Sequence, residues 1–588
     1  MKKLGFLIFC SFSMLFSKAQ VIDWASYYGP ENSGLYQLTE DRFGNLYGVL
    51  TVSGSIEQTE YMNSFITSGA FYSYHDDSQS LFFKLSPEGE VLWSSFFPGV
   101  ITDISLSSDE QSLYLSGNAS LNSDLIASED VPFPDPYEFG EDEILEGFLM
   151  KFDANGQKIW GTYLPVANYT ATDEDGNVYV SGQTSLPNIF GSEGVFEQNF
   201  LYVYNDSGWF PNTYLLKMNP EGQIIWSTYN GFGIILTIAA KNNEVYIGGH
   251  SAEYSPINYF ATTGAFASGY TNGAFLSKFN AEGQRIWSTY YGDGQNPDWI
   301  DKIKITSENK ILIAGYTRST VNIASAGTFR ENIGGTNDYF LAQFDTVGNR
   351  DWGTYYGGSE EVNGFPEDGH PVTSLNIMDT TDNYIYVSGF TNATNGISTE
   401  NGLNTSISGS YNNMDTFINI FDHQGNRLQG TYYGGTNNEF DNGIITSKTD
   451  GVFYHFGVTL STNGISTSNG SYPEFNYSPD SNHAEAYNGF LVKFGNNLNT
   501  TEIADSDEII LFPNPNNGRF TLIGTVLGKE EFKMQLFDFS GKLLISRNLG
   551  LYEEQHFDYS SYLKSGTYVV KLQSESSDIE KTFKIIVK

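Results

Sequence analysis

The side chains best suited to binding chemistry are aromatic and acidic residues that gather in long segments between apolar runs. Long aromatic and acidic loops on a rigid scaffold are how binding surfaces are built. We therefore predict a ligand-binding rim. Its members are Tyr61, Tyr137, Tyr204, Trp209, Tyr254, Tyr259, Asp293, Asp298, Glu360, Asp368 and Asp441. The alternative is that many of these rings fold back and pack against their own loops.

Motifs for catalysis or metal binding do not stand out. The seven histidines are scattered without an HExxH motif, and residues 173–177 (DEDGN) are too short for a calcium loop of the EF-hand type. The single cysteine, Cys10, lies in the N-terminal leader, so we expect no thiol in the mature chain. We predict no catalytic residue, no metal site and no cofactor. Carboxylate pairs for glycoside cleavage stay open, because such pairs form in space.

The elements that must hold the predicted rim are short strands in repeats. A β-hairpin pattern, in which a glycine-containing turn precedes a strand with tryptophan, or with Gln429 in the last case, recurs at 81–97, 148–164, 214–230, 275–291, 340–356 and 417–433. A second pattern, an alternating strand that ends in glycine, recurs at 173–185, 242–251, 309–319 and 382–392. An apolar strand precedes each of these, as at 299–307. The spacing thus predicts four strands per repeat.

Seven anchor positions set the number of repeats. They are Trp24, Trp93, Trp160, Trp226, Trp287, Trp352 and Gln429. Four-stranded units that bury a core by stacking on neighbours are typical of a β-propeller, so we predict an all-β fold with a seven-bladed propeller over residues 21–494. Each indole should lie as a wedge between blades. The lone strands at 21–29 and 490–494 should pair and close the last blade.

The repeat resembles a known bacterial family. The run W-S/G-T-Y-Y-G-G, followed by D-x-x-G-N and an alternating strand, looks like the β-propeller repeat called SBBP, over about residues 21–494. This resemblance implies an architecture and no particular activity. Gln429 departs from the tryptophan consensus, so we expect its blade to pack less tightly.

The N-terminus indicates export. Lys2 and Lys3 precede an apolar run from Leu4 to Phe16 and small residues at a cleavage-site spacing, which predicts a signal peptide over residues 1–19. No other apolar stretch is long enough to cross a membrane.

The C-terminus predicts a second domain. Residues 495–508 are polar and form a linker, and residues 509–588 contain short alternating strands that predict a small Ig-like β-sandwich. Their landmarks are Pro513, Asn514, Pro515, Gly541, Gly566 and Tyr568. This order closely resembles the type A sorting domain of the type IX secretion system of Bacteroidetes-type bacteria. The resemblance implies a secreted protein, or one attached to the outer surface of the outer membrane, with the secretion machinery as partner of residues 509–588.

The charge narrows the class of partner. The chain has a formal net charge of −39, and residues 21–504 hold 17 Lys and Arg against 57 Asp and Glu. So acidic a body repels phosphate backbones, which argues against nucleic acid. We expect a monomer that binds a glycan or another protein. Two alternatives stay open: a polysaccharide-degrading hydrolase or lyase, and a structural protein of the surface layer.

Overall fold

The computed structural model divides the chain into two compact units, residues 1–496 (unit 1) and 497–588 (unit 2). Within them the structure describes residues 21–52, 60–73, 80–119, 125–135, 138–139, 143–144, 147–187, 189–202, 204–205, 208–295, 297–358, 378–408, 413–449, 451–477, 486–495, 509–512, 518–538, 542–574 and 580–587. The predicted signal peptide, the linker 495–508 apart from its first residue, and four sorting landmarks, Pro513, Asn514, Pro515 and Gly541, lie outside the described residues.

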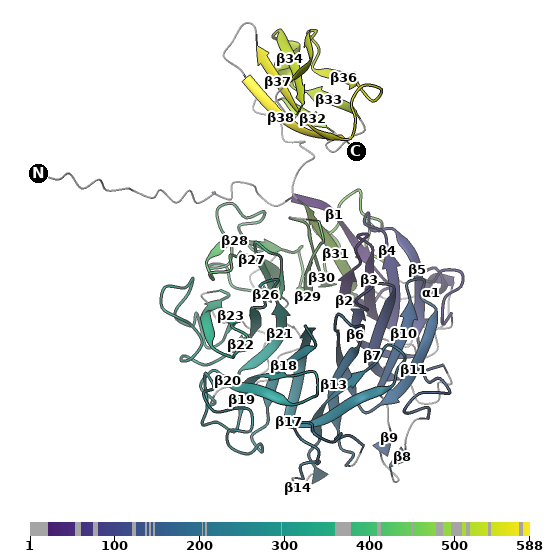
Figure 1. Cartoon of the computed structure of the whole chain (residues 1–588), viewed down its shortest axis with the longest axis vertical. Helices are drawn as coiled ribbons and strands as arrows, with labels where there is room; N and C mark the ends of the chain where they lie inside the picture. The colour runs from purple at the N-terminus through teal and green to yellow at the C-terminus, as the bar shows by residue number, and fades with distance from the viewer. Residues whose placement is uncertain are drawn as a thin grey trace, which may run out of the picture. The chain divides into compact units, whose positions relative to one another are not determined.

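The fold is all-β, as the sequence predicts, and unit 1 is built from sets of four antiparallel strands (Figure 1). Set 1 is β2 (Ser33–Glu40), β3 (Leu46–Val52), β4 (Ser80–Leu85) and β5 (Val91–Phe97). Set 2 is β6 (Gly99–Leu106), β7 (Ser112–Ala119), β10 (Gly147–Asp153) and β11 (Lys158–Leu164). Set 3 is β12 (Ala167–Thr172), β13 (Val178–Thr184), β16 (Asn212–Met218) and the first half of β17 (Ile224–Lys241).

The second half of β17 begins the next set, so that sets 3 and 4 form one seven-stranded sheet. Set 4 continues with β18 (Glu244–Ser251), β19 (Gly273–Phe279) and β20 (Arg285–Tyr291). Set 5 is β21 (Trp299–Ile305), β22 (Ile311–Thr317), β23 (Asp338–Phe344) and β24 (Arg350–Tyr356). Set 6 is β25 (Met378–Thr380), β26 (Ile385–Thr391), β27 (Asp415–Phe421) and β28 (Arg427–Tyr433). Set 7 is β29 (Glu439–Thr446), β30 (Phe453–Thr459), β31 (Asn488–Gly495) and β1 (Val21–Tyr28).

Three small elements lie between these strands. They are the helix α1 (Glu60–Asn63) and the two-stranded pairs β8 (Glu138–Phe139) with β9 (Glu143–Ile144), and β14 (Tyr204–Asn205) with β15 (Gly208–Trp209).

The turns follow from their sequence. In the turn between β2 and β3, Asp41 Oδ1 accepts hydrogen bonds from the backbone N–H groups of Phe43 and Asn45, both at 2.9 Å. Gly44 adopts a φ of 82°, a conformation that glycine reaches without steric cost. The same aspartate-to-glycine arrangement recurs at residues 173–177, so the motif D-x-x-G-N fixes where strands reverse.

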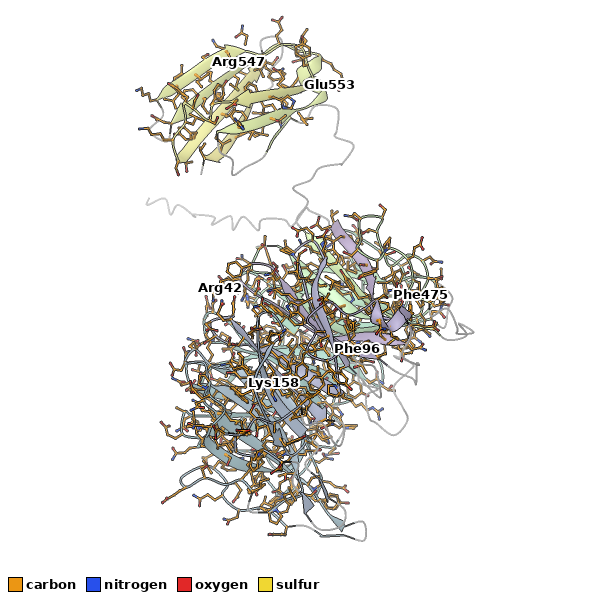
Figure 2. All side chains as sticks on the ribbon, turned by 90° about the vertical axis from the view of Figure 1, so that its right-hand side faces the viewer. Arg42, Phe96, Lys158, Phe475, Arg547 and Glu553 are labelled. Carbon is orange, nitrogen blue, oxygen red and sulfur yellow. The ribbon has the colours of Figure 1, made fainter. Side chains whose placement is uncertain are left out.

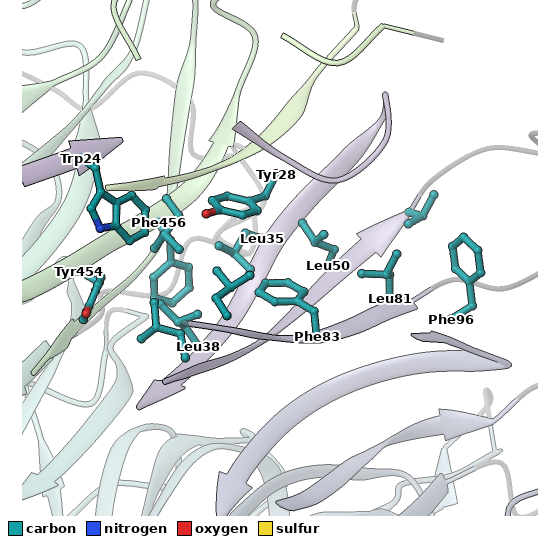
Figure 3. Packing of buried hydrophobic residues seen from close by; sticks show 14 of the residues in the cluster. Trp24, Tyr28, Leu35, Leu38, Leu50, Leu81, Phe83, Phe96, Tyr454 and Phe456 are labelled. Atoms are coloured by element: carbon teal, nitrogen blue, oxygen red, sulfur yellow. The ribbon is translucent and has the colours of Figure 1, made fainter. Parts of the chain in front are cut away.

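The sets pack in a closed cycle. Seven hydrophobic clusters among the described residues of unit 1 each join two consecutive sets. One of them joins set 7 to set 1, where Trp24 and Tyr454 lie near Leu35 and Leu38 (Figure 3). The first strands of consecutive sets also contact one another, and β29 contacts β2. Each set therefore buries apolar surface against two neighbouring sets, and the row of sheets has no open end.

The two strands at the chain ends of unit 1 pair with each other. β1 runs antiparallel to β31, with Trp24 opposite Lys493 and Tyr28 opposite Gly489. The other edge of β1 is covered by a loop, because the Ala25 N–H donates to Thr467 Oγ1 at 2.8 Å and the Tyr27 N–H donates to Tyr472 O at 3.0 Å. β1 is therefore bonded on both sides.

The same cover protects the outer strand of every set. In each set the long loop between the second and third strands folds back along the fourth strand and bonds its backbone. In set 4, for example, the Thr262 N–H donates to Ser288 O at 2.9 Å and the Tyr290 N–H to Ala267 O at 3.3 Å. Covered edges do not pair with other chains.

The anchor tryptophans join consecutive sets. Trp287 in β20 donates from Nε1 to Thr346 O at 2.9 Å, and a Cβ added at Gly348 would lie 3.0 Å from its ring. The other five repeat this contact on the next set. The donors and acceptors are Trp24 and Pro87 O, Trp93 and Ala154 O, Trp160 and Pro220 O, Trp226 and Ala281 O, and Trp352 and His423 O. Each indole thus occupies the joint between two sheets.

Gln429 occupies the seventh anchor position for a structural reason. In the next set the two outer strands are β31 and β1, which belong to opposite ends of unit 1 and are not joined by a turn. A tryptophan at position 429 would have no turn glycine to pack against and no turn carbonyl to accept a hydrogen bond from its Nε1. Gln429 is instead buried and donates from Nε2 to Asn401 O at 2.9 Å within its own set.

Unit 2 consists of two sheets that share one hydrophobic cluster. One sheet is β32 (Ile510–Phe512), β33 (Arg519–Ile523) and β36 (Glu554–Asp558), and the other is β35 (Leu543–Asn548), β34 (Phe532–Asp538), β37 (Gly566–Ser574) and β38 (Glu580–Val587). A 3-10 helix spans Thr525–Gly528. Gly566 begins β37, and Tyr568 Oη donates to Lys564 O at 2.8 Å. In the part of the chain that the structure describes, no helix is long and apolar enough to span a membrane.

Candidate functional site

A cavity of about 840 Å³ lies where the first strands of all seven sets meet, and we call it the inner cavity. Its wall runs from the middle of each first strand to the turn that follows. It includes Gln37–Glu40, Asp103–Ser108, Thr170–Thr172, Ile238–Lys241, Lys302–Ile305, Asp379–Asn383 and Ile444–Lys448. The volume falls within the usual range of pockets for small molecules.

The inner cavity lies at the ends of the first strands that lead into the short turns. In set 1, Glu40 pairs with Leu46 next to the turn, whereas Ser33 pairs with Val52 at the other end, where the long loop begins. The lining residues of this set, Gln37 to Glu40, belong to the turn end. The predicted rim of long loops and the inner cavity are therefore at opposite ends of the strands.

The turns at this end hold one another in place. Glu110 Oε2 accepts a hydrogen bond from the Arg42 N–H at 2.6 Å, and Glu174 Oε2 accepts one from the Asn242 N–H at 2.8 Å. Asn242 Nδ2 in turn donates to Asn309 Oδ1 at 3.2 Å. Arg42, which Figure 2 labels, is one of several polar residues on these turns. Side-chain bonds between neighbouring sets thus fix the end of unit 1 at which the inner cavity lies.

Most carboxylates on the wall already have protein donors. Asp103 Oδ2 accepts hydrogen bonds from the Thr170 N–H at 2.7 Å and Oγ1 at 2.8 Å. Glu40 accepts from Ser447 Oγ at 2.8 Å and from the Lys448 N–H at 2.7 Å. These bonds tie set 2 to set 3 and set 7 to set 1.

Asp379 is the best satisfied of the wall carboxylates. It lies 3.1 Å from Lys304 Nζ and accepts the Thr446 N–H at 2.8 Å. Burial alone would raise the pKa of Asp379, but Lys304 and the amide donors outweigh burial and hold that pKa below its usual range.

Lys302 differs from the other wall residues. It lies two residues before Lys304 on β21, hence on the same face of the strand, and it lines the inner cavity. Among the described residues no acceptor lies within hydrogen-bond or ion-pair distance of its ammonium group. Burial, with a smaller contribution from the neighbouring Lys304, lowers the pKa of Lys302 to about 8.

The described aromatic members of the predicted rim lie in the long loops between the second and third strands of their sets. Tyr61 is on α1, where its Oη accepts the Glu31 N–H at 2.8 Å. Tyr254 is 43 % exposed and packs on Phe210, with ring centroids 4.3 Å apart. Tyr259 lies against Phe196 and Arg285.

Three further aromatic candidates are described in part or not at all. Tyr204 and Trp209 are opposite each other in the β14–β15 hairpin, and their side chains lie outside the description. Tyr137 lies outside the described residues.

Of the described acidic members of the predicted rim, Asp293 and Asp298 lie close together and share Ser319, whereas Asp441 belongs to β29 of another set. Asp293 accepts the Gln295 N–H at 2.9 Å in the segment between β20 and β21. Asp298 is fully buried and accepts hydrogen bonds from Thr317 Oγ1 and Ser319 Oγ, both at 2.6 Å. Burial raises the pKa of Asp298 to about 6. Glu360 and Asp368 lie outside the described residues.

Asp441 belongs to a buried group that resembles a hydrolase triad. His455 Nδ1 lies 3.4 Å from Asp441 Oδ1, and His455 Nε2 lies 2.8 Å from Thr416 Oγ1. All three residues are 0 % exposed, and burial lowers the pKa of His455 to about 3, so the imidazole is neutral at physiological pH. A group closed to solvent in this way holds β27, β29 and β30 together and offers no access to a substrate.

Lys302 and Lys304 are the site residues that the sequence analysis missed. Both lie in the strand at 299–307, which the sequence predicts from its apolar residues. The signal was present, because two lysines two residues apart place two charges on one face of an otherwise apolar strand. Among the described residues no cluster of His, Cys, Asp and Glu could hold a metal ion.

Comparison with known proteins identifies unit 2. Residues 510–588 match the family described as the secretion system C-terminal sorting domain. This domain indicates that the protein is secreted and attached to the cell surface, and it implies an interaction with the secretion machinery. No curated protein matches the sequence.

Three solved structures show weak similarity. The acylaminoacyl peptidase of Pyrococcus horikoshii is 9 % identical, with 76 % of this chain and 50 % of that chain covered and a TM-score of 0.35. A mutant apocarotenoid oxygenase of Synechocystis is 11 % identical, with coverages of 74 % and 88 % and a TM-score of 0.33. PorZ of Porphyromonas gingivalis, a surface component of the type IX secretion system, is 11 % identical, with coverages of 96 % and 100 % and a TM-score of 0.13. The chain spans half the length of the peptidase, and TM-scores this low say nothing about how it acts.

Proposed function

We propose that this protein is a binding protein of the cell surface, whose unit 1 is a seven-bladed β-propeller that holds a ligand in the inner cavity. The propeller assignment is supported by seven four-strand sets, by hydrophobic clusters that join them in a cycle, and by the pairing of β1 with β31. The sorting domain indicates secretion to the cell surface, so the proposed ligand would be met outside the cell.

The observation that carries the binding role is the inner cavity itself. It is built by all seven sets, and hydroxyl, carboxylate and ammonium groups line it together with a few aliphatic side chains. A concave site with convergent polar groups on rigid strands is the usual form of a small-molecule site. The ligand would be a glycan fragment or another polar molecule of that size, in keeping with the glycan class that the sequence suggests.

The proposal also covers the route of export and the type of repeat in unit 1. Residues 1–19 would be the signal peptide that starts export, and unit 1 would consist of SBBP-type repeats. The rim of long loops stays a second predicted surface, through which a protein partner would bind.

The test is to fill the inner cavity. Ala239 is on its wall and packs beside the cluster that joins sets 4 and 5, so an Ala239→Trp variant that keeps the Tm of the natural chain would narrow the space that a ligand needs. An array of neutral and acidic oligosaccharides should yield ligands of the full chain that bind this variant at least about tenfold more weakly, a loss of about 1.4 kcal/mol. The matched control is Ala265→Trp, in the loop between β18 and β19. Ligands that bind both variants equally would exclude the inner cavity as the site.

A further inference from the structure

The wall of the inner cavity carries more positive charge than its surroundings predict. Residues 21–504 contain only 17 Lys and Arg against 57 Asp and Glu. Four of those 17 line this one cavity, namely Lys241, Lys302, Lys304 and Lys448, together with five carboxylates. An acidic protein therefore concentrates cations at the place where its seven sets meet.

Three of the four lysines have a protein acceptor or lie close to solvent. Lys304 lies 3.1 Å from Asp379, and Lys241 Nζ donates to Thr306 O at 2.7 Å. Lys448 is mostly exposed and lies 4.0 Å from Glu110. Solvent or a protein group thus compensates each of these charges.

Lys302 has no such compensation within the described ranges. It is half-buried in a first strand, and Asp103 and Asp379 act on it only through space. Among the described residues neither carboxylate lies within ion-pair distance of Lys302; Asp103 Oδ2 is bonded to Thr170, and Asp379 is paired with Lys304. A cation removed from water without an acceptor is unfavourable unless a partner supplies the missing bonds.

We propose that the inner cavity binds a small organic anion whose carboxylate or sulfate group lies on the ammonium group of Lys302. This inference rests on the proposed function and specifies the chemistry of its ligand. The surrounding hydroxyl groups, among them Ser105, Thr380 and Thr446, suit a hydroxylated molecule such as an acidic sugar. Phe456 is the one aromatic side chain among the lining residues, so polar contacts rather than ring stacking would hold the ligand.

The experiment follows the reactivity of Lys302 in the full chain. An acylating reagent modifies only the neutral amine, and mass spectrometry compares Lys302 with the exposed Lys533 of unit 2 as internal reference. D-glucuronate and inorganic sulfate serve as carboxylate and sulfate probes, and D-glucose is the neutral match of glucuronate. An anion on the ammonium group raises the pKa of Lys302. A rise of one unit reduces the neutral amine, and hence the labelling rate, about tenfold.

We expect one or both anions to slow the labelling of Lys302 while Lys533 is unaffected and glucose has no effect. Which anion acts identifies a carboxylate or a sulfate ligand. Calorimetry should then show that Lys302→Met weakens binding of that anion at least about tenfold, whereas Lys533→Met, outside the inner cavity, changes it about twofold or less.

Three results would overturn the inference. If neither anion slows the labelling at the highest soluble concentration, no anion binds to Lys302. If Lys302→Met leaves anion binding unchanged, the anion binds elsewhere. If glucose protects Lys302 as well as glucuronate does, the inner cavity takes neutral ligands, and the proposed binding role stands without the anion.

Discussion

At the scale of single residues, the contact between a tryptophan and the glycine of the next set's turn repeats six times in unit 1. The indole fits because a turn glycine such as Gly348, with a φ of 91°, has no side chain on the surface that the ring covers. The Nε1 group also donates to a turn carbonyl, Thr346 O, which accepts a second hydrogen bond from Lys278 Nζ at 3.2 Å. Ring packing and the Nε1 hydrogen bond therefore join the same indole to the same turn.

We predict that Trp287→Leu lowers the free energy of unfolding by about 3 kcal/mol, because it removes buried ring area and one of the two donors to Thr346 O. Urea unfolding followed by fluorescence and circular dichroism measures the change. The adjacent Ile286 is 50 % exposed, so Ile286→Ala should change stability by about 0.5 kcal/mol or less. Equal effects of the two variants would contradict the assigned role of the indole.

The tryptophan positions could be predicted from sequence because the ring and its turn recur together, at a constant place in each hairpin. The reason for a glutamine at position 429 could not be predicted from sequence, because it depends on which strands lack a connecting turn. The same limit applies to Asp298 and Asp441. Sequence marks them as acidic loop residues, and only the packed structure buries them among hydroxyl and imidazole groups.

At the scale of elements, β1 holds unit 1 closed. It supplies the outer strand of set 7, and its residues Trp24 and Tyr28 contribute to the cluster between set 7 and set 1. Without β1, the edge of β31 would be unpaired and that cluster would be exposed. Exposed edges of this kind pair with other chains.

We predict that deletion of residues 21–28 lowers the Tm of the chain by at least about 10 °C and produces aggregates. Differential scanning fluorimetry and size-exclusion chromatography measure the two effects. Asp23→Asn is the matched control, because Asp23 makes a partly exposed ion pair with Lys493 that adds about 1 kcal/mol at most. A deletion variant that stays monomeric with an unchanged Tm would show that β1 does not close the cycle.

The hairpins were predictable from alternating patterns and turn residues, but the course of the long loops was not. Loop residues such as Thr262 and Ala267 bond to β20 through their backbone, and a backbone bond leaves little trace in the side-chain pattern. The sequence pattern predicts that these loops form a rim, and the structure adds that each of them also runs along the outer strand of its set. The inner cavity escaped prediction for a related reason, since each set contributes only a few residues to it.

At the scale of the whole molecule, several carboxyl groups are buried with raised pKa values. Burial raises the pKa of Asp338 and of Asp415 to about 7 and that of Asp298 to about 6. The folded chain therefore binds protons that the unfolded chain does not hold at the same pH. Stability from these groups is present at low pH and is lost as the pH rises through their folded pKa values. His455 acts in the opposite sense, because only the unfolded chain protonates it below about pH 6.5.

We predict that the Tm rises by several degrees when the pH falls from 8 to 6, since each pKa unit corresponds to about 1.4 kcal/mol. The lower negative charge of the body acts in the same direction. Asp415→Asn removes one titrating group, so this variant should show a smaller rise between the same two pH values. Thermal melts in matched ionic strength measure both. A Tm that falls on acidification to pH 6 would contradict the assignment.

The pairing of β1 with β31 also sets an order of events in time. The first strand of unit 1 can pair with β31 only after the last strand has been made, so every shorter intermediate of synthesis leaves β1 unpaired. Contacts between such distant parts of a chain form late and slowly. Pairing of β1 with β31 would thus be a late step of folding, and until it occurs the cluster between set 7 and set 1 lacks Trp24 and Tyr28.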